Sequence, residues 1–206
     1  MPGPKDDLTL LIEAALRAGD IAKLHFGNDP KVYDKGAEGP VTVADIAIDA
    51  MLHDTLRAAR PDYGWLSEET EDTDARLDHE HVFICDPIDG TRAFIEGGKS
   101  FSHSLAVARN GQITAAAVFL PMRDKLYAAS LGGGTTLNNT SVRVTETSAL
   151  EAATVLTTKA NLQAHHWAGD LPPVGKAYRP SRAYRMSLVG EGRFDAMMTF
   201  RPTGEL

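Results

Sequence analysis

The stretch Val82-Phe83-Ile84-Cys85-Asp86-Pro87-Ile88-Asp89-Gly90-Thr91 joins an apolar run to two acidic residues three positions apart. The continuously apolar part predicts a strand that is covered on both faces. The proline fixes one backbone angle, and the glycine permits a close approach of the backbone. We therefore expect a buried strand that ends in a stiff turn, with Asp86 and Asp89 presented at that end.

Two chemical interpretations of this turn are possible. Hard divalent cations prefer carboxylate and carbonyl oxygens, so Asp86, Asp89 and the Ile88 carbonyl could form half of a metal site. Free amides of Gly90 and Thr91 at the start of a following helix could hold a phosphate. The alternative is an ordinary Asp-Pro turn with a side-chain cap, which is common in proteins.

Two upstream segments supply further acidic residues. Ser67-Glu68-Glu69 follows a predicted strand at residues 63–66, where Glu68 could complete a coordination shell or belong to a solvated acidic turn. Thr42-Val43-Ala44-Asp45 has the spacing of a capping box that opens a helix. Asp45 could serve both as a cap and near a site.

The rest of the chain predicts an α+β layered fold rather than a regular βαβ array. Apolar residues recur at helical spacing in residues 8–26 and again after Asp45 as far as Arg60. Asn110-Gly111 is a strong hairpin signal between two predicted strands. The predicted strands are residues 101–109, 112–120, 125–129, 154–158 and 193–200, residues 181–190 are a predicted helix, and residues 161–176 are expected to be irregular.

Composition limits the classes of partner. The formal net charge of −7 gives no attraction to nucleic acid or to an acidic membrane. No apolar run approaches the length of a membrane span, and the start has no run like that of a signal peptide. The single cysteine, Cys85, excludes an internal disulfide and is expected to pack in the core. We expect a soluble cytoplasmic protein that binds neither nucleic acid polymers nor membranes.

Three segments together resemble the inositol monophosphatase family, the lithium-sensitive, magnesium-dependent phosphatases. They are Val41-Thr42-Val43-Ala44-Asp45, Ser67-Glu68-Glu69-Thr70 and Asp86-Pro87-Ile88-Asp89-Gly90-Thr91, in the family's order and spacing. Residues 132–139 and 187–195 extend the resemblance over the chain. It implies an α+β fold, a layered α/β/α/β/α sandwich of the inositol-monophosphatase and sugar-phosphatase type. Residues 1–130 would form an α+β part that carries the motifs, and residues 131–206 a C-terminal part.

The resemblance also implies roles for individual residues. Glu68, Asp86 and the Ile88 carbonyl would hold one Mg2+, and Asp86 and Asp89 would share a second. The amides of Gly90 and Thr91, with Asp89 beside them and Lys35 nearby, would bind the phosphorylated substrate. Thr91, paired with Asp45, would help Glu68 to activate the attacking water, in the two-metal scheme for displacement at phosphorus.

The implied activity is hydrolysis of a small phosphate monoester by a homodimeric enzyme. Inositol monophosphate is the first substrate to consider. The alternatives inside the family are a 3′(2′),5′-bisphosphate nucleotide and histidinol phosphate, and the sequence does not choose among them.

Two departures from the family pattern qualify this expectation. Ser67 stands where the family commonly has glycine. The sequence stops near the point where the family has a Trp-Asp-x-Ala-Ala-Gly segment, whose aspartate completes the second metal site, and Glu205 is a poor substitute for it. We therefore expect a complete first metal site, a weakened second one and an incomplete second sheet. A non-catalytic relative that binds metal or phosphate is the remaining alternative.

Overall fold

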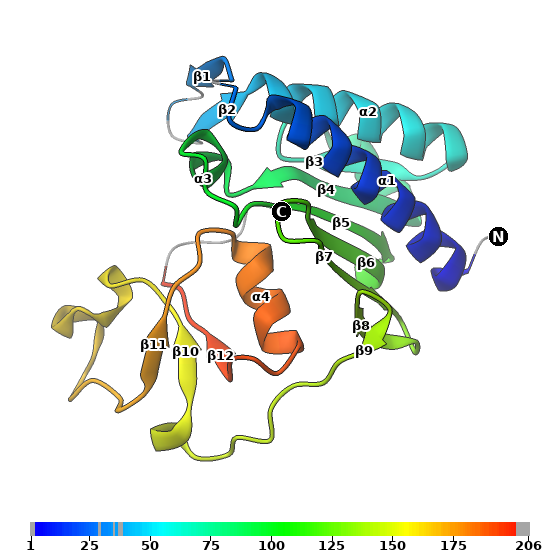
Figure 1. The fold of residues 1–206 in the computed structure, drawn as a ribbon. Helices are drawn as coiled ribbons and strands as arrows, with labels where there is room; N and C mark the ends of the chain where they lie inside the picture. The colour runs from blue at the N-terminus through cyan, green and yellow to red at the C-terminus, as the bar shows by residue number, and fades with distance from the viewer. Residues whose placement is uncertain (1–2, 29, 35, 37–38, 201–206) are drawn as a thin grey trace.

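The computed structural model describes residues 3–28, 30–34, 36 and 39–200 of the chain. Two long helices, α1 (Pro4–His25) and α2 (Val43–Ala59), lie side by side over one face of a sheet (Figure 1). Both helices were predicted, because their apolar residues recur at helical spacing and face the sheet, but α1 begins four residues before the predicted start at Leu8. None of the described helices has the length and apolar character needed to cross a membrane.

The large sheet contains seven strands in the order β3-β4-β5-β6-β7-β8-β9. The β3–β4 pair is parallel, and each later neighbour is antiparallel. The turn between β5 and β6 has positive φ at Asn110 (48°) and Gly111 (80°), as the Asn-Gly signal predicts. The strands are β3 (Gly64–Ser67), β4 (His81–Asp89), β5 (Ser102–Arg109), β6 (Gln112–Leu120), β7 (Lys125–Ser130), β8 (Gly134–Leu137) and β9 (Thr140–Ser141).

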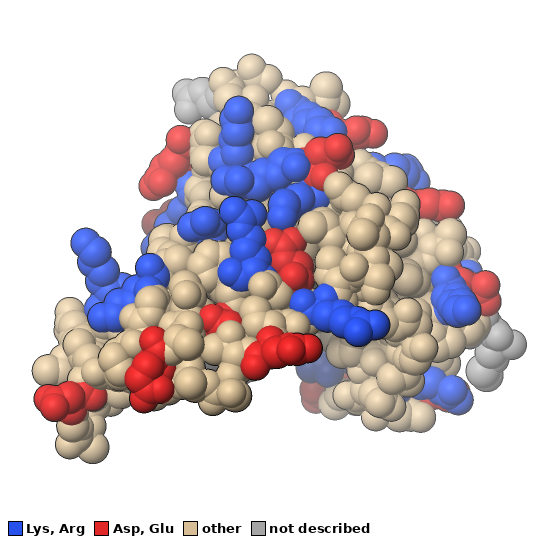
Figure 2. All heavy atoms as spheres, turned by 60° about the horizontal axis from the view of Figure 1, so that its bottom comes forward, with Lys and Arg blue, Asp and Glu red and all other residues tan. Residues whose placement is uncertain are grey.

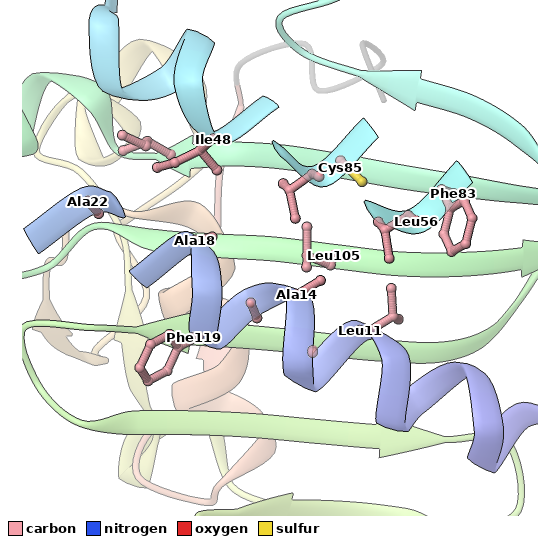
Figure 3. Close-up of a cluster of buried hydrophobic side chains, with 14 of the residues drawn as sticks. Leu11, Ala14, Ala18, Ala22, Ile48, Leu56, Phe83, Cys85, Leu105 and Phe119 are labelled. Atoms are coloured by element: carbon pink, nitrogen blue, oxygen red, sulfur yellow. The ribbon is translucent and has the colours of Figure 1, made fainter. Parts of the chain in front are cut away.

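The main core lies between the helix pair and this sheet (Figure 3). Small side chains of α1, such as Ala14 and Ala18, let the helix approach Leu105 and Phe119 closely. At Gly19 a Cβ atom would lie 2.4 Å from Cε1 of Phe119, so only glycine fits there without a shift. This tight packing fixes α1 and α2 relative to the strand ends that carry the acidic residues.

A smaller second part lies on the other face of the large sheet (Figure 1). Helix α4 (Arg182–Gly190) contributes Tyr184 and Leu188 to a cluster with Leu120, Tyr127 and Leu156. A parallel three-stranded sheet of order β11-β10-β12 follows, formed by β10 (Thr154–Leu156), β11 (Gly175–Ala177) and β12 (Ala196–Met197). The layers therefore run helix pair, sheet, helix, sheet, which confirms the α+β layered class.

Several elements differ from the sequence predictions. The strand expected at residues 193–200 is only β12, because its neighbour β10 offers just three residues for pairing. The irregular region holds 3-10 turns at Ala160–Leu162 and Ala164–His166 and ends in β11. Sequence reasoning also missed the small antiparallel pair of β1 (Val32–Asp34) and β2 (Pro40–Thr42). Further 3-10 turns lie at Asp74–Asp78 and Leu150–Ala152.

Three expectations remain outside these observations. Lys35 and Glu205 lie outside the described residues. The division of the chain at residue 130 stays a prediction, and the first sheet itself includes β8 and β9 beyond that point.

Candidate active site

The parallel pairing of β3 with β4 brings two acidic residues to one edge of the sheet. Ser67 lies opposite Cys85, and the amide of Glu68 donates to the Cys85 carbonyl at 3.2 Å. Glu68, directly after the end of β3, therefore lies beside Asp86 in the last part of β4. The two separate sequence motifs meet here because parallel strands end on the same side of a sheet.

The segment from Asp86 to Asp89 remains part of β4 instead of forming the expected free turn. Its pairing with β5 shifts register between Asp86, which lies opposite Ser104, and Asp89, which lies opposite Ser102. Such an irregularity bends the strand and changes the direction of its side chains. Asp89 consequently reaches α4, where its Oδ2 accepts hydrogen bonds from Ser181 Oγ and the Ala183 amide, both at 2.6 Å.

Asp45 joins the first turn of α2 to this edge. Its Oδ2 accepts from the amide and hydroxyl of Thr42, at 2.8 and 2.5 Å, which confirms the capping box. Its Oδ1 lies 3.4 Å from the Thr91 hydroxyl, which also lies 3.0 Å from the Ile88 carbonyl. Burial, only partly offset by the Thr42 hydrogen bonds, raises the pKa of Asp45 to about 6. Thr91 thus has two alternative acceptors for its single proton.

The carboxyl group of Asp86 is strongly perturbed by its surroundings. Burial raises its pKa well above the ordinary value, and the nearby charges of Asp89, Glu68 and Asp45, with a hydrogen bond to Glu68, raise it further. Its Oδ1 is enclosed and has no hydrogen-bond partner. A buried acceptor without a partner is costly, and the nearby carboxylates add to the cost of its charge, so this oxygen fits a bound cation.

The carboxylates are not arranged as a finished coordination shell. No group of three or more His, Cys, Asp or Glu side chains in the described part of the chain is placed to hold a metal ion. The donor set still suits a hard divalent cation, because it consists of carboxylates and the Ile88 carbonyl.

Asp49 is a positioning residue that sequence reasoning missed. Its two carboxylate oxygens accept from Ser67 Oγ at 2.5 Å and Thr70 Oγ1 at 2.8 Å. These bonds hold the turn that carries Glu68. Asp49 stands four residues after Asp45 on α2, so helical spacing placed both on the same face and was the available signal. Ser67, a departure from the family pattern, therefore has a structural partner.

His103 and Ser181 are further residues that the sequence did not single out. The Nδ1 of His103 lies 2.5 Å from the Pro87 carbonyl, in the middle of the acidic stretch. Ser181 caps α4 by accepting from the Tyr184 amide at 2.9 Å while it contacts Asp89. The position of Ser181 directly before a predicted helix was the only sequence signal, and it indicated the helix cap but not the contact with Asp89.

Gly90 occupies a position that requires glycine. Its φ is +99°, a backbone conformation that residues with a side chain rarely adopt, although a Cβ atom would make only ordinary contacts there. It precedes the short helix α3 (Thr91–Ile95), while Arg92 on that helix is exposed. The structure therefore brings Glu68, Asp86, Asp89, Asp45, Gly90 and Thr91 into one region, with the position of Lys35 not described.

A layered α+β fold of this kind is also found in a known phosphatase. The solved structure of the IMPase of Thermotoga maritima matches with a TM-score of 0.79 and 27% identity, over 92% of this chain and 74% of that one. The model of the inositol monophosphatase family matches residues 5–205. The chain belongs to this family, whose members are phosphoric monoester hydrolases.

Two curated relatives show the range of names in the family. The inositol-1-monophosphatase of Rhizobium meliloti is 33% identical over 91% of this chain and 74% of its own length. The Nus factor SuhB of Vibrio cholerae is 32% identical over 77% of this chain and 60% of its own length.

Proposed function

We propose that the protein hydrolyses a small phosphate monoester in a magnesium-dependent reaction. The observation that supports this most is the enclosed, unpartnered Oδ1 of Asp86 amid other carboxylates. Without a counter-ion such a cluster opposes folding. The chemistry of the donors matches that of a Mg2+ site, and the position at the end of β4 matches the family motif.

The residues that would hold Mg2+ are Glu68, Asp86, the Ile88 carbonyl and Asp89. When bound, magnesium favours ionisation of a bound water and neutralises charge on the phosphoryl group and the leaving oxygen. The Ile88 carbonyl accepts from Thr91 and keeps a second lone pair for this purpose. Asp89 keeps its Oδ1 available, because its bonds to α4 both use Oδ2.

The remaining site residues would bind and orient the reactants. Asp45 and the Ile88 carbonyl are the alternative acceptors of the Thr91 hydroxyl proton, and either bond leaves the hydroxyl oxygen free to accept from the attacking water. Glu68 would hold that water from the neighbouring strand and take its proton. The amides of Gly90 and Thr91, with Lys35, would bind the phosphate oxygens.

Inositol monophosphate is the first substrate to test, because a relative with 33% identity is named for it. A bisphosphate nucleotide and histidinol phosphate remain the alternatives. A cytoplasmic location and a homodimer stay predictions, and sedimentation equilibrium tests the second of them.

The deciding experiment measures phosphate release from inositol 1-phosphate, 3′-phosphoadenosine 5′-phosphate and histidinol phosphate with Mg2+. We expect turnover that a chelator removes and that Asp89→Asn lowers at least about a hundredfold. Asp20→Asn, an exposed change on α1, is the matched control and should keep full activity. Folded protein that binds Mg2+ but releases phosphate from none of the three esters would favour the non-catalytic alternative.

A further inference from the structure

Three arginines surround the start of α4, next to the candidate metal ligands. Arg179, Arg182 and Arg185 stand three residues apart along the chain. The same helix start donates to Asp89 through Ser181 and Ala183. Figure 2 shows that Lys and Arg side chains gather in a band across one face of this acidic protein.

Arg185 is the unusual member, because its side chain is only 7% exposed. Its Nε lies 3.4 Å from the Ser181 carbonyl, and its guanidinium lies 5.7 Å from the centre of the Tyr178 ring. Burial lowers the pKa of Arg185, partly opposed by the charges of Tyr178 and Asp89, and Arg182 lowers it further. The charges of Arg185 and Asp89 therefore interact with each other.

Within the described ranges of the chain, no carboxylate compensates this buried charge directly. Among the described residues, no Asp or Glu forms an ion pair with Arg179, Arg182 or Arg185. The two terminal nitrogens of Arg185 have no acceptor in that part of the chain, yet they are not among the fully enclosed atoms. These two nitrogens are therefore accessible to a ligand. Buried cations are normally paired, so an external anion is the missing partner.

The helix itself makes the excess positive charge less favourable. The first turn of α4 contains Arg182 and no acidic residue. A cation at this end opposes the helix dipole, whereas an anion is stabilised there. The charge of Asp89 raises the pKa of Arg185, and a cation bound to Asp89 would offset that effect.

We propose that Arg185, assisted by Arg182, binds a second anionic group of the substrate, so that the preferred ester carries a phosphate or carboxylate besides the phosphate that is cleaved. This inference rests on the proposed phosphatase function and narrows its substrate class. Arg185 acts as a specificity-determining residue, since its partner is a part of the substrate that does not react.

The test compares pairs of esters that differ by one anionic group. The pairs are adenosine 3′-phosphate with adenosine 3′,5′-bisphosphate, and inositol 1-phosphate with inositol 1,4-bisphosphate. In at least one pair we expect kcat/KM to be about tenfold higher for the doubly charged ester, a difference typical of one charge-assisted contact. Arg185→Gln should remove that preference mainly through KM, and Arg185→Lys should restore part of it.

Arg193→Gln is the matched control, because Arg193 is exposed beyond the other end of α4. It should leave the preference intact. An equal loss on both esters of a pair in Arg185→Gln, or no preference in either pair for the wild type, would overturn the inference.

A binding measurement separates this result from failure of the proposed function. Adenosine 5′-phosphate carries one anionic group that adenosine lacks. The affinities of both compounds are measured by calorimetry with Mg2+ present, a measurement that does not depend on turnover. Tighter binding of the phosphate that Arg185→Gln abolishes would support the anion site even if no ester is hydrolysed. Equal affinities in wild type and variant, together with no turnover, would refute both.

Discussion

Asp86 and His103 lie on paired strands, and each keeps a buried polar atom without a hydrogen-bond partner. Both residues belong to or contact the last residues of β4, Asp86 to Asp89. Asp86 supplies a carboxylate to it, and His103 holds its Pro87 carbonyl. At the scale of single residues, the site therefore retains unfavourable features that a packed core would normally exclude.

Replacing Asp86 tests whether its carboxylate serves a cation. Asp86→Asn should be at least as stable as the wild type without metal, because a repelled carboxyl becomes a neutral amide. It should lose the stabilisation by Mg2+, which amounts to about 2.7 kcal/mol at a hundredfold excess over Kd. Thermal melts with and without Mg2+ measure both effects, and Asp20→Asn is the control. An unchanged Mg2+ effect in Asp86→Asn would contradict the assignment.

Replacing His103 tests its role through pH. Burial, partly opposed by the bond to Pro87, lowers the pKa of His103 to about 4 from its ordinary value of 6.5. Between pH 6.5 and pH 4 the His103 side chain is protonated in the unfolded chain but neutral in the folded protein. The free energy of unfolding that His103 contributes is therefore fully present above pH 6.5 and is lost as the pH falls to 4. The full loss is about 3 kcal/mol.

The difference in unfolding free energy between wild type and His103→Phe should therefore shrink as pH falls from 7 to 4. Urea denaturation at several pH values measures it. Asp45, which titrates with the opposite sign, is present in both proteins and cancels in the difference. His165→Phe, a change at an exposed position, should leave the pH slope unchanged. Parallel curves for wild type and His103→Phe would refute a neutral buried His103.

At the scale of elements, the start of α4 is the point where the second part of the molecule meets the site. Ser181 accepts from the helix, donates to Asp89 and lies 2.9 Å from Ser102 Oγ. One hydroxyl thus links α4 to β4 and β5. The helix begins here because its cap satisfies a free amide, and the same cap holds a candidate metal ligand.

Ser181→Ala should cost about 1–2 kcal/mol of stability, the range for loss of a helix cap. It should also weaken Mg2+ binding, because Asp89 loses a donor. Ser187→Ala is the matched control on the same helix, where the hydroxyl only contacts the Ala183 carbonyl, and should change stability by less than about 0.5 kcal/mol. Equal effects of the two variants on Mg2+ binding would contradict the linking role.

At the scale of the whole molecule, the two parts have cores of unequal size. The main core joins α1 and α2 to strands of the large sheet, whereas the second core is a small cluster around α4. The strands β10, β11 and β12 have at most three residues each. Local opening requires less free energy where fewer apolar side chains are buried.

The rates of amide hydrogen exchange should therefore differ between the two parts of the molecule. We expect amides of β4, β5 and β6 to exchange only by global unfolding and those of β10 and β12 to exchange faster by local opening. Exchange followed by mass spectrometry at increasing urea concentration measures this. Identical opening free energies for the two groups would show that the parts unfold as one unit.

The sequence by itself determined the elements whose information is local. Apolar spacing placed α1 and α2, Asn110-Gly111 placed the β5–β6 turn, and Thr42 and Asp45 specified a capping box. These features depend on residues a few positions apart, so the physical preference can be evaluated from the chain alone. The resemblance of the acidic motifs added the layered fold and the family.

Only the tertiary structure decided which groups meet at the site. Asp89 and Ser181 are 92 residues apart, His103 and Pro87 are 16 apart, and no local preference predicts either contact. The register shift in β4, the support of Ser67 by Asp49 and the burial of Arg185 likewise depend on how whole elements pack. Burial and hydrogen bonding are properties of the assembled fold, because water competes for these groups until distant segments exclude it.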